Sequence, residues 1–303
     1  MIDFKPALFQ EATNRQGMLC NLKDYEALLY NDSKMLKKRG VKVWDQAFEC
    51  SVFSMYSNET AHRHLLLLGG MGPLAGVYGA VDVVKNISNV SITLFQACGI
   101  LERKVGVEVS SSLSSALKSA IDVCPDDKPI DLIVLCNSAH QYMHDVLSRC
   151  NLRHRFNFHS LIDSVKKNLY LFHNKKSIVL QTDFSAYNGL YASLENVCSL
   201  DDIPALTAYK KQLFNIIEGV KSFNKEKVLK NGITLFKALH AHKIETVLLG
   251  CTELPIAIEY LQQQETTLPT EVLESFHFIN PLHLLIQELN NQEKKHAYDS
   301  VAS

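Results

Sequence analysis

Short apolar runs alternate with segments of helical periodicity from residue 64 onward. The runs predict buried strands, because a strand that is covered on both faces is apolar at nearly every position. They lie at 65–68, 90–95, 130–135, 177–181 and 245–249, and the helical segments lie at 75–87, 107–123, 205–220, 225–242 and 254–262, with Pro281 opening a last helix. Strands alternating with helices predict parallel sheets that are covered by helices.

Residues 1–63 do not continue this alternation. They hold a segment of helical spacing that Gly40 ends, followed by an element around 41–53 that contains the only tryptophan, Trp44. Because this region carries no chemical motif that we can interpret, we treat it as an N-terminal extension of unknown role.

Two segments, one in each half of the chain, mirror each other. Residues 132–140 read LIVLCNSAH and residues 246–253 read TVLLGCTE, so each apolar run ends in a cysteine, Cys136 or Cys251. A thiol at a strand-to-helix junction lies near the positive end of a helix dipole, which stabilises a thiolate. Two such thiols could face one substrate from opposite sides. That geometry is needed to remove a proton from one face of a carbon and return one to the other.

The repetition predicts an α/β fold of two pseudo-symmetric lobes of parallel sheet flanked by helices, with the active site in the cleft between them. We expect the first lobe to comprise 64–160 plus 270–295, and the second lobe to comprise 161–269. Ligands of such sheets bind beyond the carboxyl ends of the strands, which is where both cysteines fall.

Composition narrows the class of protein. Lys and Arg total 31 against 32 Asp and Glu, a net charge of −1, which gives no electrostatic argument for a nucleic-acid partner. No apolar run approaches the length of a membrane span, and the first residues lack the order of a signal peptide. Eight scattered cysteines without a Cys-x-x-Cys pair are typical of reduced thiols. We therefore expect a cytoplasmic protein with no nucleic-acid or membrane partner, and leave a homodimer open.

Other interpretations of the motifs stay open. Residues 69–76 mimic a dinucleotide fingerprint, but no acidic residue follows the next strand, and a tight turn whose N–H groups hold a carboxylate is simpler. His140 and His144 have the spacing of metal ligands on a helix, but no third ligand lies nearby in the sequence. The simpler interpretation is that His140 supports the Cys136 loop. Either cysteine alone could be a buried, inert thiol.

Several segments together resemble the aspartate/glutamate racemase superfamily, and specifically its aspartate racemase branch. GGMGP at 69–73 is similar to the family's first glycine turn, CNSAH at 136–140 to its first catalytic box, and GCTELP at 250–255 to its second. Residues 181–191 are similar to the polar loop that opens the second half. Glutamate racemases usually carry His where this chain has Glu253, so the aspartate or broad-specificity branch fits better.

This resemblance implies a PLP-independent racemase with no cofactor and no metal. It implies that Cys136 and Cys251 are the catalytic bases, with Cys251 acting on the L isomer and Cys136 on the D isomer. Arg103 and Lys221 match the cations that bind the substrate's carboxylates. The other residues expected to bind substrate are Met71, Gly72, Asn137, Ser138, Thr182, Ser185, Thr252 and Glu253.

The expected activity is therefore racemisation of an acidic amino acid, with aspartate as the first candidate. Racemisation of glutamate or of a broad range of amino acids is the alternative within the same chemistry. The alternative of another class is a non-catalytic protein that binds an amino acid on this fold and acts through its N-terminal extension.

Overall fold

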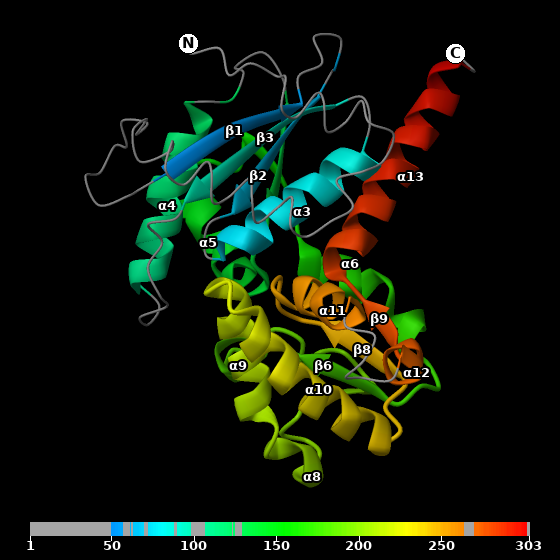
Figure 1. The fold of residues 1–303 in the computed structure, drawn as a ribbon. Helices are drawn as coiled ribbons and strands as arrows, with labels where there is room; N and C mark the ends of the chain where they lie inside the picture. The colour runs from blue at the N-terminus through cyan, green and yellow to red at the C-terminus, as the bar shows by residue number, and fades with distance from the viewer. Residues whose placement is uncertain are drawn as a thin grey trace.

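Two sheets flanked by helices make up the part of the chain that the structure describes (Figure 1). The structure is a computed structural model, and it describes residues 50–56, 61, 63–69, 72–87, 90–97, 107–122, 124, 129–263 and 270–301. The expected α/β fold with two lobes of parallel sheet is confirmed, apart from one antiparallel edge strand in the first sheet.

The first sheet has the strand order β1-β3-β2-β4-β5, in which only β1 runs antiparallel. Alternate leucines of β2 point to opposite faces, as the two-residue period of a strand requires. Leu65 and Leu67 pack with α3, whereas Leu66 and Leu68 pack with α4 and α5. The elements are β1 (Cys50–Tyr56), β2 (Arg63–Gly69), α3 (Pro73–Asn86), β3 (Val90–Ala97), α4 (Val107–Ile121), β4 (Ile130–Val134), η1 (Asn137–Ala139), α5 (His140–Arg149) and β5 (Phe156–His159).

The second sheet has the order β7-β6-β8-β9, and all its strands are parallel. Helices α9, α10 and α11 cover one face, and α6 with η2 covers the other. The elements are α6 (Leu161–Lys167), η2 (Leu169–Phe172), β6 (Ser177–Leu180), α7 (Asp183–Tyr187), β7 (Val197–Cys198), α8 (Pro204–Thr207), α9 (Lys210–Lys221), α10 (Lys225–Ala241), β8 (Thr246–Leu249), α11 (Leu254–Gln262), α12 (Thr270–Glu274), β9 (His277–Ile279) and α13 (Pro281–Val301). Among the described helices, none combines the length and apolar character that a membrane span needs.

The two lobes share one apolar core and several polar contacts. A single cluster of buried side chains runs from β2 and β4 through α3 to β6, β8 and α11. Tyr78 of α3 donates a 2.8 Å hydrogen bond to Glu259 of α11, and His283 of α13 lies 2.7 Å from Asp82 of α3. In Figure 1, α13 (red) rises from beside β9 and passes along α3. Helix α3 therefore contacts both the second sheet's helices and the C-terminal helix.

Three differences between the observed elements and the sequence-based expectation concern segments that the sequence analysis named. Residues 50–56, expected to belong to the extension, form the edge strand β1 of the first sheet. Residues 277–279, expected with the first lobe, form β9 in the second sheet, because a three-residue strand leaves no readable period. The helix expected at 205–220 is two helices, α8 and α9. The division of the chain into domains at these boundaries stays a prediction.

A buried ionic cluster lies near the amino end of the first sheet. Asp131 of β4 is 3% exposed and accepts hydrogen bonds from Arg63 and His159, each at 2.7 Å, and from Asn157 at 2.8 Å. Burial disfavours the charge of this carboxylate. The hydrogen bonds from His159 and Arg63 and their positive charges outweigh burial, and they lower the pKa of Asp131 to about 2.

We expect Asp131→Asn to lower the free energy of unfolding at pH 7 by about 3 kcal/mol, because it leaves the Arg63 charge without its buried partner. The folded-state pKa lies below its ordinary value of 3.8, so the stabilisation is present above pH 4 and is lost as the pH falls toward 2. Urea titrations at pH 7, 4 and 2.5 measure both effects. Asp145→Asn, which removes an exposed pair with Arg149, is the control. A deficit that stays constant with pH would contradict the assignment.

Candidate active site

Cys136 lies two residues beyond the end of β4, in a loop that turns directly into η1 and α5. Its backbone is extended, with a φ of −158°, and the helical turn begins at Asn137. The Cys136 thiol is 3.4 Å from the Ser138 hydroxyl. Cys136, Asn137 and Ser138 are all buried. The first lobe thus presents a thiol, a carboxamide and a hydroxyl side by side at the carboxyl end of its sheet.

His140 fixes the backbone of this loop. Its Nδ1–H donates to the Cys136 carbonyl oxygen at 2.9 Å, and its Nε2 accepts from the Leu161 N–H, at the start of α6, at 3.1 Å. This pattern needs the neutral ring, and burial lowers the pKa of His140 to about 4. His140 therefore acts as a structural clamp, and both of its nitrogens are engaged, which leaves it no lone pair for a metal ion.

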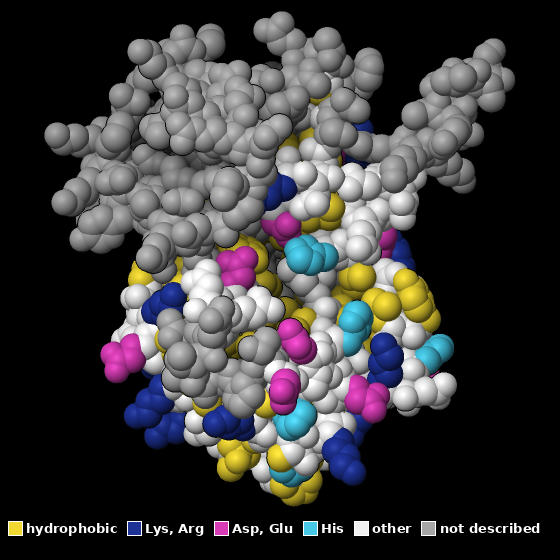
Figure 2. Space-filling model, turned by 45° about the vertical axis from the view of Figure 1, so that its right-hand side comes forward, with side chains coloured by type: hydrophobic (Ala, Val, Ile, Leu, Met, Phe, Trp, Pro, Cys, Tyr) yellow, Lys and Arg dark blue, Asp and Glu magenta, His cyan; other side chains and the backbone are white. Residues whose placement is uncertain are grey.

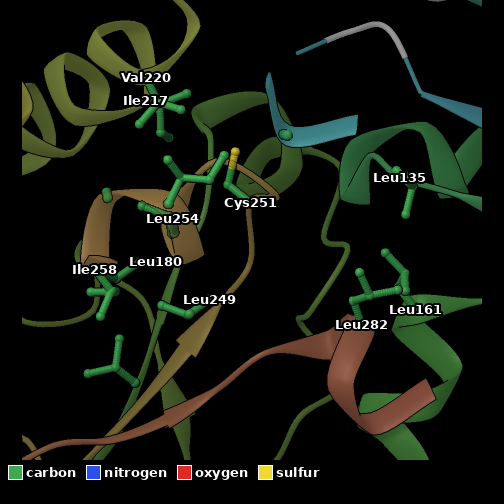
Figure 3. Packing of buried hydrophobic residues seen from close by; sticks show 14 of the residues in the cluster. Leu135, Leu161, Leu180, Ile217, Val220, Leu249, Cys251, Leu254, Ile258 and Leu282 are labelled. Carbon is green, nitrogen blue, oxygen red and sulfur yellow. The ribbon is translucent and has the colours of Figure 1, made fainter. Parts of the chain in front are cut away.

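Cys251 occupies the equivalent place in the second lobe, two residues beyond the end of β8 (Figure 3). Gly250 lets the loop pass close to the end of β6, because a side chain there would meet the Leu180 carbonyl oxygen at 3.0 Å. The Cys251 thiol donates to the Glu253 carboxylate at 2.8 Å. Leu254 of α11 lies beside Cys251, and Val220 of α9 lies on the other side of Leu254 (Figure 3).

The Cys251 loop contacts the glycine turn of the first lobe through Glu253. Gly72 has extended backbone, with a φ of −141°, and the Glu253 carboxylate lies where a side chain on Gly72 would be. Glu253 itself is 3% exposed. A side chain at position 72 would therefore displace the Glu253 carboxylate from its place beside the glycine turn.

A second-lobe segment contacts the Cys136 loop in return. Helix α7 packs against η1, and the rings of Phe184 and Tyr142 stack with centroids 6.3 Å apart. Tyr191 donates to Asn137 Oδ1 at 3.0 Å across the lobes. Each cysteine loop is thus held by a polar or glycine contact from the opposite lobe.

The Tyr191 phenol lies within electrostatic range of both cysteines. Burial is the main cause that raises the pKa of Tyr191 well above its usual value, and negative charge on Cys251 and Cys136 adds to it. The phenol that bonds Asn137 thus links the two cysteine loops, and the expectation that both thiols face one substrate stays a prediction. The phenol stays protonated there and can only donate or accept hydrogen bonds as a neutral group.

Several expected substrate-binding residues lie in these loops. Thr182 caps α7 by accepting from the Ser185 N–H at 3.2 Å, and the two hydroxyls are 3.0 Å apart. Thr252 lies 3.4 Å from Glu253 Oε2. Lys221, the last residue of α9, pairs with Glu218 at 2.9 Å, and its expected place beside the substrate stays a prediction.

Met71 and Arg103 lie outside the described residues, so their expected roles stay predictions. Gly72, Asn137, Ser138 and Glu253 are placed at or beside the two cysteine loops, as described above. The substrate-binding roles of these residues also stay predictions.

Two residues of the site carry no role in the sequence analysis. Tyr191 lies inside the segment that resembles the family's polar loop, but nothing in a sequence shows that its hydroxyl reaches the other lobe. Gln96 at the end of β3 lies against Gly69 and Gly76, where side chains on those glycines would be. Its carboxamide thus fills the space beside the two glycines. In the sequence, the only indication of this role is that a polar residue follows the apolar run at 90–95.

Comparisons with known proteins identify the fold. No protein-family model and no curated protein matches the sequence. Among solved structures, an aspartate racemase from Picrophilus torridus matches with a TM-score of 0.57 at 18% identity, over 76% of this chain and 94% of that one. An aspartate racemase homologue from Pyrococcus horikoshii matches at 0.48 and 16%, over 76% and 98% of the two chains. A glutamate racemase from Bacillus anthracis matches at 0.46 and 16%, over 78% and 84%.

The architecture is therefore that of a two-lobed α/β protein with a loop from each lobe at a shared site. More particularly, the chain has the fold of the aspartate/glutamate racemases, so the resemblance that the sequence motifs predict is confirmed for the fold. At this level of identity the likeness establishes the fold and not the substrate.

We expect His140→Asn to destabilise the protein by about 2 kcal/mol at pH 7.5, because the buried Leu161 N–H loses its acceptor. The wild type itself should lose stability on the order of 2 kcal/mol between pH 7.5 and 5 through this residue. Its folded-state pKa of about 4 lies below the ordinary 6.5, so the unfolded chain gains a proton first as pH falls.

Urea titrations of both proteins at pH 7.5 and 5 measure this difference. The gap in unfolding free energy between wild type and variant should narrow at pH 5. An equal gap at both values would show that the ring does not stay neutral in the folded protein.

Proposed function

We propose that this chain is a cofactor-independent racemase of an acidic amino acid, with aspartate as its substrate. The observation that supports the proposal is that Tyr191 of the second lobe bonds Asn137, the neighbour of Cys136, and lies within electrostatic range of both Cys136 and Cys251. A racemase needs two groups that exchange protons with the two faces of one carbon, and Cys136 and Cys251 are suited to that role.

In the proposed reaction a thiolate on one side removes the α-proton, and the thiol on the other side donates a proton to the opposite face. The two cysteines exchange protonation states at each turnover, so no proton is gained or lost overall. Cys251 acts on the L isomer and Cys136 on the D isomer.

Glu253 supports this exchange at Cys251. Its carboxylate accepts a hydrogen bond from the thiol at 2.8 Å. It can therefore take up the Cys251 proton when Cys251 becomes the base, and return it after Cys251 has donated a proton to the substrate in the opposite direction. It is buried and held against Gly72, which keeps its oxygen in reach of the sulfur. We therefore propose that Glu253 exchanges a proton with the Cys251 thiol, in addition to the contact with substrate expected from the sequence.

The substrate's two carboxylates need donors and cations. Five side chains supply hydrogen-bond donors for these carboxylates. They are Asn137 and Ser138 after Cys136, Thr252 after Cys251, and Thr182 and Ser185 at the start of α7. Lys221 supplies a cation from the end of α9, and a carboxylate would replace or share Glu218 as its partner. Arg103, Met71 and Gly72 complete the proposed binding set.

Incubation of purified protein with L-aspartate in deuterated water tests the proposal. We expect deuterium at Cα together with D-aspartate, measured by mass spectrometry and chiral chromatography. A panel with L-glutamate and neutral amino acids measures the preference for aspartate. Absence of exchange with every acidic amino acid would refute the proposed activity.

Replacing either thiol should separate the two half-reactions. We expect Cys136→Ser and Cys251→Ser each to abolish racemisation while the protein stays folded, because a hydroxyl is a far weaker acid than a thiol. Cys136→Ser should still exchange the α-proton of L-aspartate, and Cys251→Ser that of D-aspartate, as followed by NMR in deuterated water. Cys198→Ser is the control, since this thiol lies in β7. Racemisation by Cys136→Ser at the wild-type rate would rule out the two-thiol mechanism.

Glu253→Gln should lower kcat about 100-fold, because the amide fills the same space but takes up no proton. Exchange of the α-proton of L-aspartate, which needs Cys251 as base, should slow more than exchange with D-aspartate. Glu259→Gln is the matched control, since that half-buried glutamate belongs to the same helix and bonds Tyr78. Equal slowing of both isomers in Glu253→Gln would mean that Glu253 does not act through Cys251.

A further inference from the structure

Tyr191 connects the core of the second lobe to the Cys136 loop of the first lobe. The residue is 3% exposed, and its ring packs in the cluster that contains Val179 and Leu248 of the second sheet. Its hydroxyl leaves this apolar environment and reaches Asn137, which directly follows Cys136. A buried ring held on one lobe is a rigid support for a side chain on the other.

Only one direction of the hydrogen bond between Tyr191 and Asn137 leaves the hydroxyl proton with an acceptor. With Asn137 Oδ1 as acceptor, the phenol donates its proton at 3.0 Å. If the carboxamide were turned over, its N–H would donate to the phenol oxygen, and the hydroxyl proton would need another acceptor. Within the described ranges, Asn137 is the only hydrogen-bond partner of the Tyr191 hydroxyl. A buried hydroxyl proton without an acceptor is costly, so the amide is held with its carbonyl toward Tyr191.

The nitrogen of the same carboxamide is then the group left for a ligand. Among the residues that the structure describes, none accepts a hydrogen bond from Asn137 Nδ2. Asn137 is the first residue of η1 and directly follows Cys136, whose thiol is 3.4 Å from the Ser138 hydroxyl. Two N–H donors beside a catalytic thiol suit a carboxylate and are unsuited to an ammonium group, which only donates.

We propose that Tyr191 is a positioning residue, which fixes the Asn137 carboxamide so that its N–H donors face a carboxylate of the substrate beside Cys136. This assignment rests on the proposed function, because it specifies how that site recognises one end of an acidic amino acid. Tyr191 itself does not touch the substrate. Its effect on binding passes entirely through Asn137.

A double-mutant cycle tests this dependence. Tyr191→Phe keeps the packed ring and removes the hydroxyl, and we expect KM for L-aspartate to rise about tenfold while kcat changes less than about threefold. Asn137→Ala should raise KM at least as much. The double variant should be no worse than Asn137→Ala alone, because Tyr191 acts only through the amide. Tyr78→Phe, which loses another phenol bond between the lobes, should leave KM unchanged.

Binding of succinate, measured by calorimetry, repeats the cycle without chemistry. If the wild type binds succinate but exchanges no α-proton of aspartate, the proposed racemisation fails, and the succinate cycle alone decides the role of Tyr191. If the wild type racemises aspartate and the two substitutions have independent, additive effects, the role of Tyr191 is wrong and the racemase proposal stands. If the wild type binds neither aspartate nor succinate, both proposals fail.

The amide itself can be observed in the free protein. The side-chain NH2 resonances of Asn137 are those that disappear in Asn137→Ala, and in Tyr191→Phe we expect them to shift. Resonances that stay unchanged in a folded Tyr191→Phe variant would overturn the inference, whatever the kinetics.

Discussion

The site depends on two contacts that cross between the lobes in opposite directions. Glu253 of the second lobe lies against Gly72 of the first, and Tyr191 of the second lobe bonds Asn137 of the first. Each contact fixes the neighbour of one cysteine, so neither loop takes its position from its own lobe alone. The shared apolar core through α3 keeps the lobes together while these contacts set the relative placement of the loops.

The two thiols are chemically unlike, although their loops are alike. Cys136 has a neutral hydroxyl 3.4 Å away, whereas Cys251 donates to a buried carboxylate at 2.8 Å. Two similar lobes thus hold two thiols with different partners. This suits a racemisation, because the two substrate isomers are mirror images of each other, whereas the protein groups on the two sides of the substrate are not. In each loop the partner of the thiol is the second residue after the cysteine, which is Ser138 in one loop and Glu253 in the other.

The sequence predicts the parts that depend on local patterns. Apolar runs and helical periodicity located β2, β4, β6 and β8, because a buried strand leaves a direct trace in the sequence. The mirrored segments located both cysteines at strand ends. Three-residue β9 and the single-turn α7 left no periodicity to read. Tyr191 could be seen only as part of a motif, because a hydrogen bond between residues 54 positions apart has no local signal.

The two ends of the first sheet differ in the charge of their buried polar groups. At the amino end Asp131 is a buried charge, and Arg63 and His159 satisfy it within the protein. At the carboxyl end, three buried groups of the Cys136 loop besides the thiol are neutral: a carboxamide, a hydroxyl and an imidazole whose pKa burial lowers to about 4. Neutral donors can take a carboxylate from outside without first giving up an internal ion pair. The charge of an acidic substrate would therefore add to this end of the sheet without displacing a charge already there.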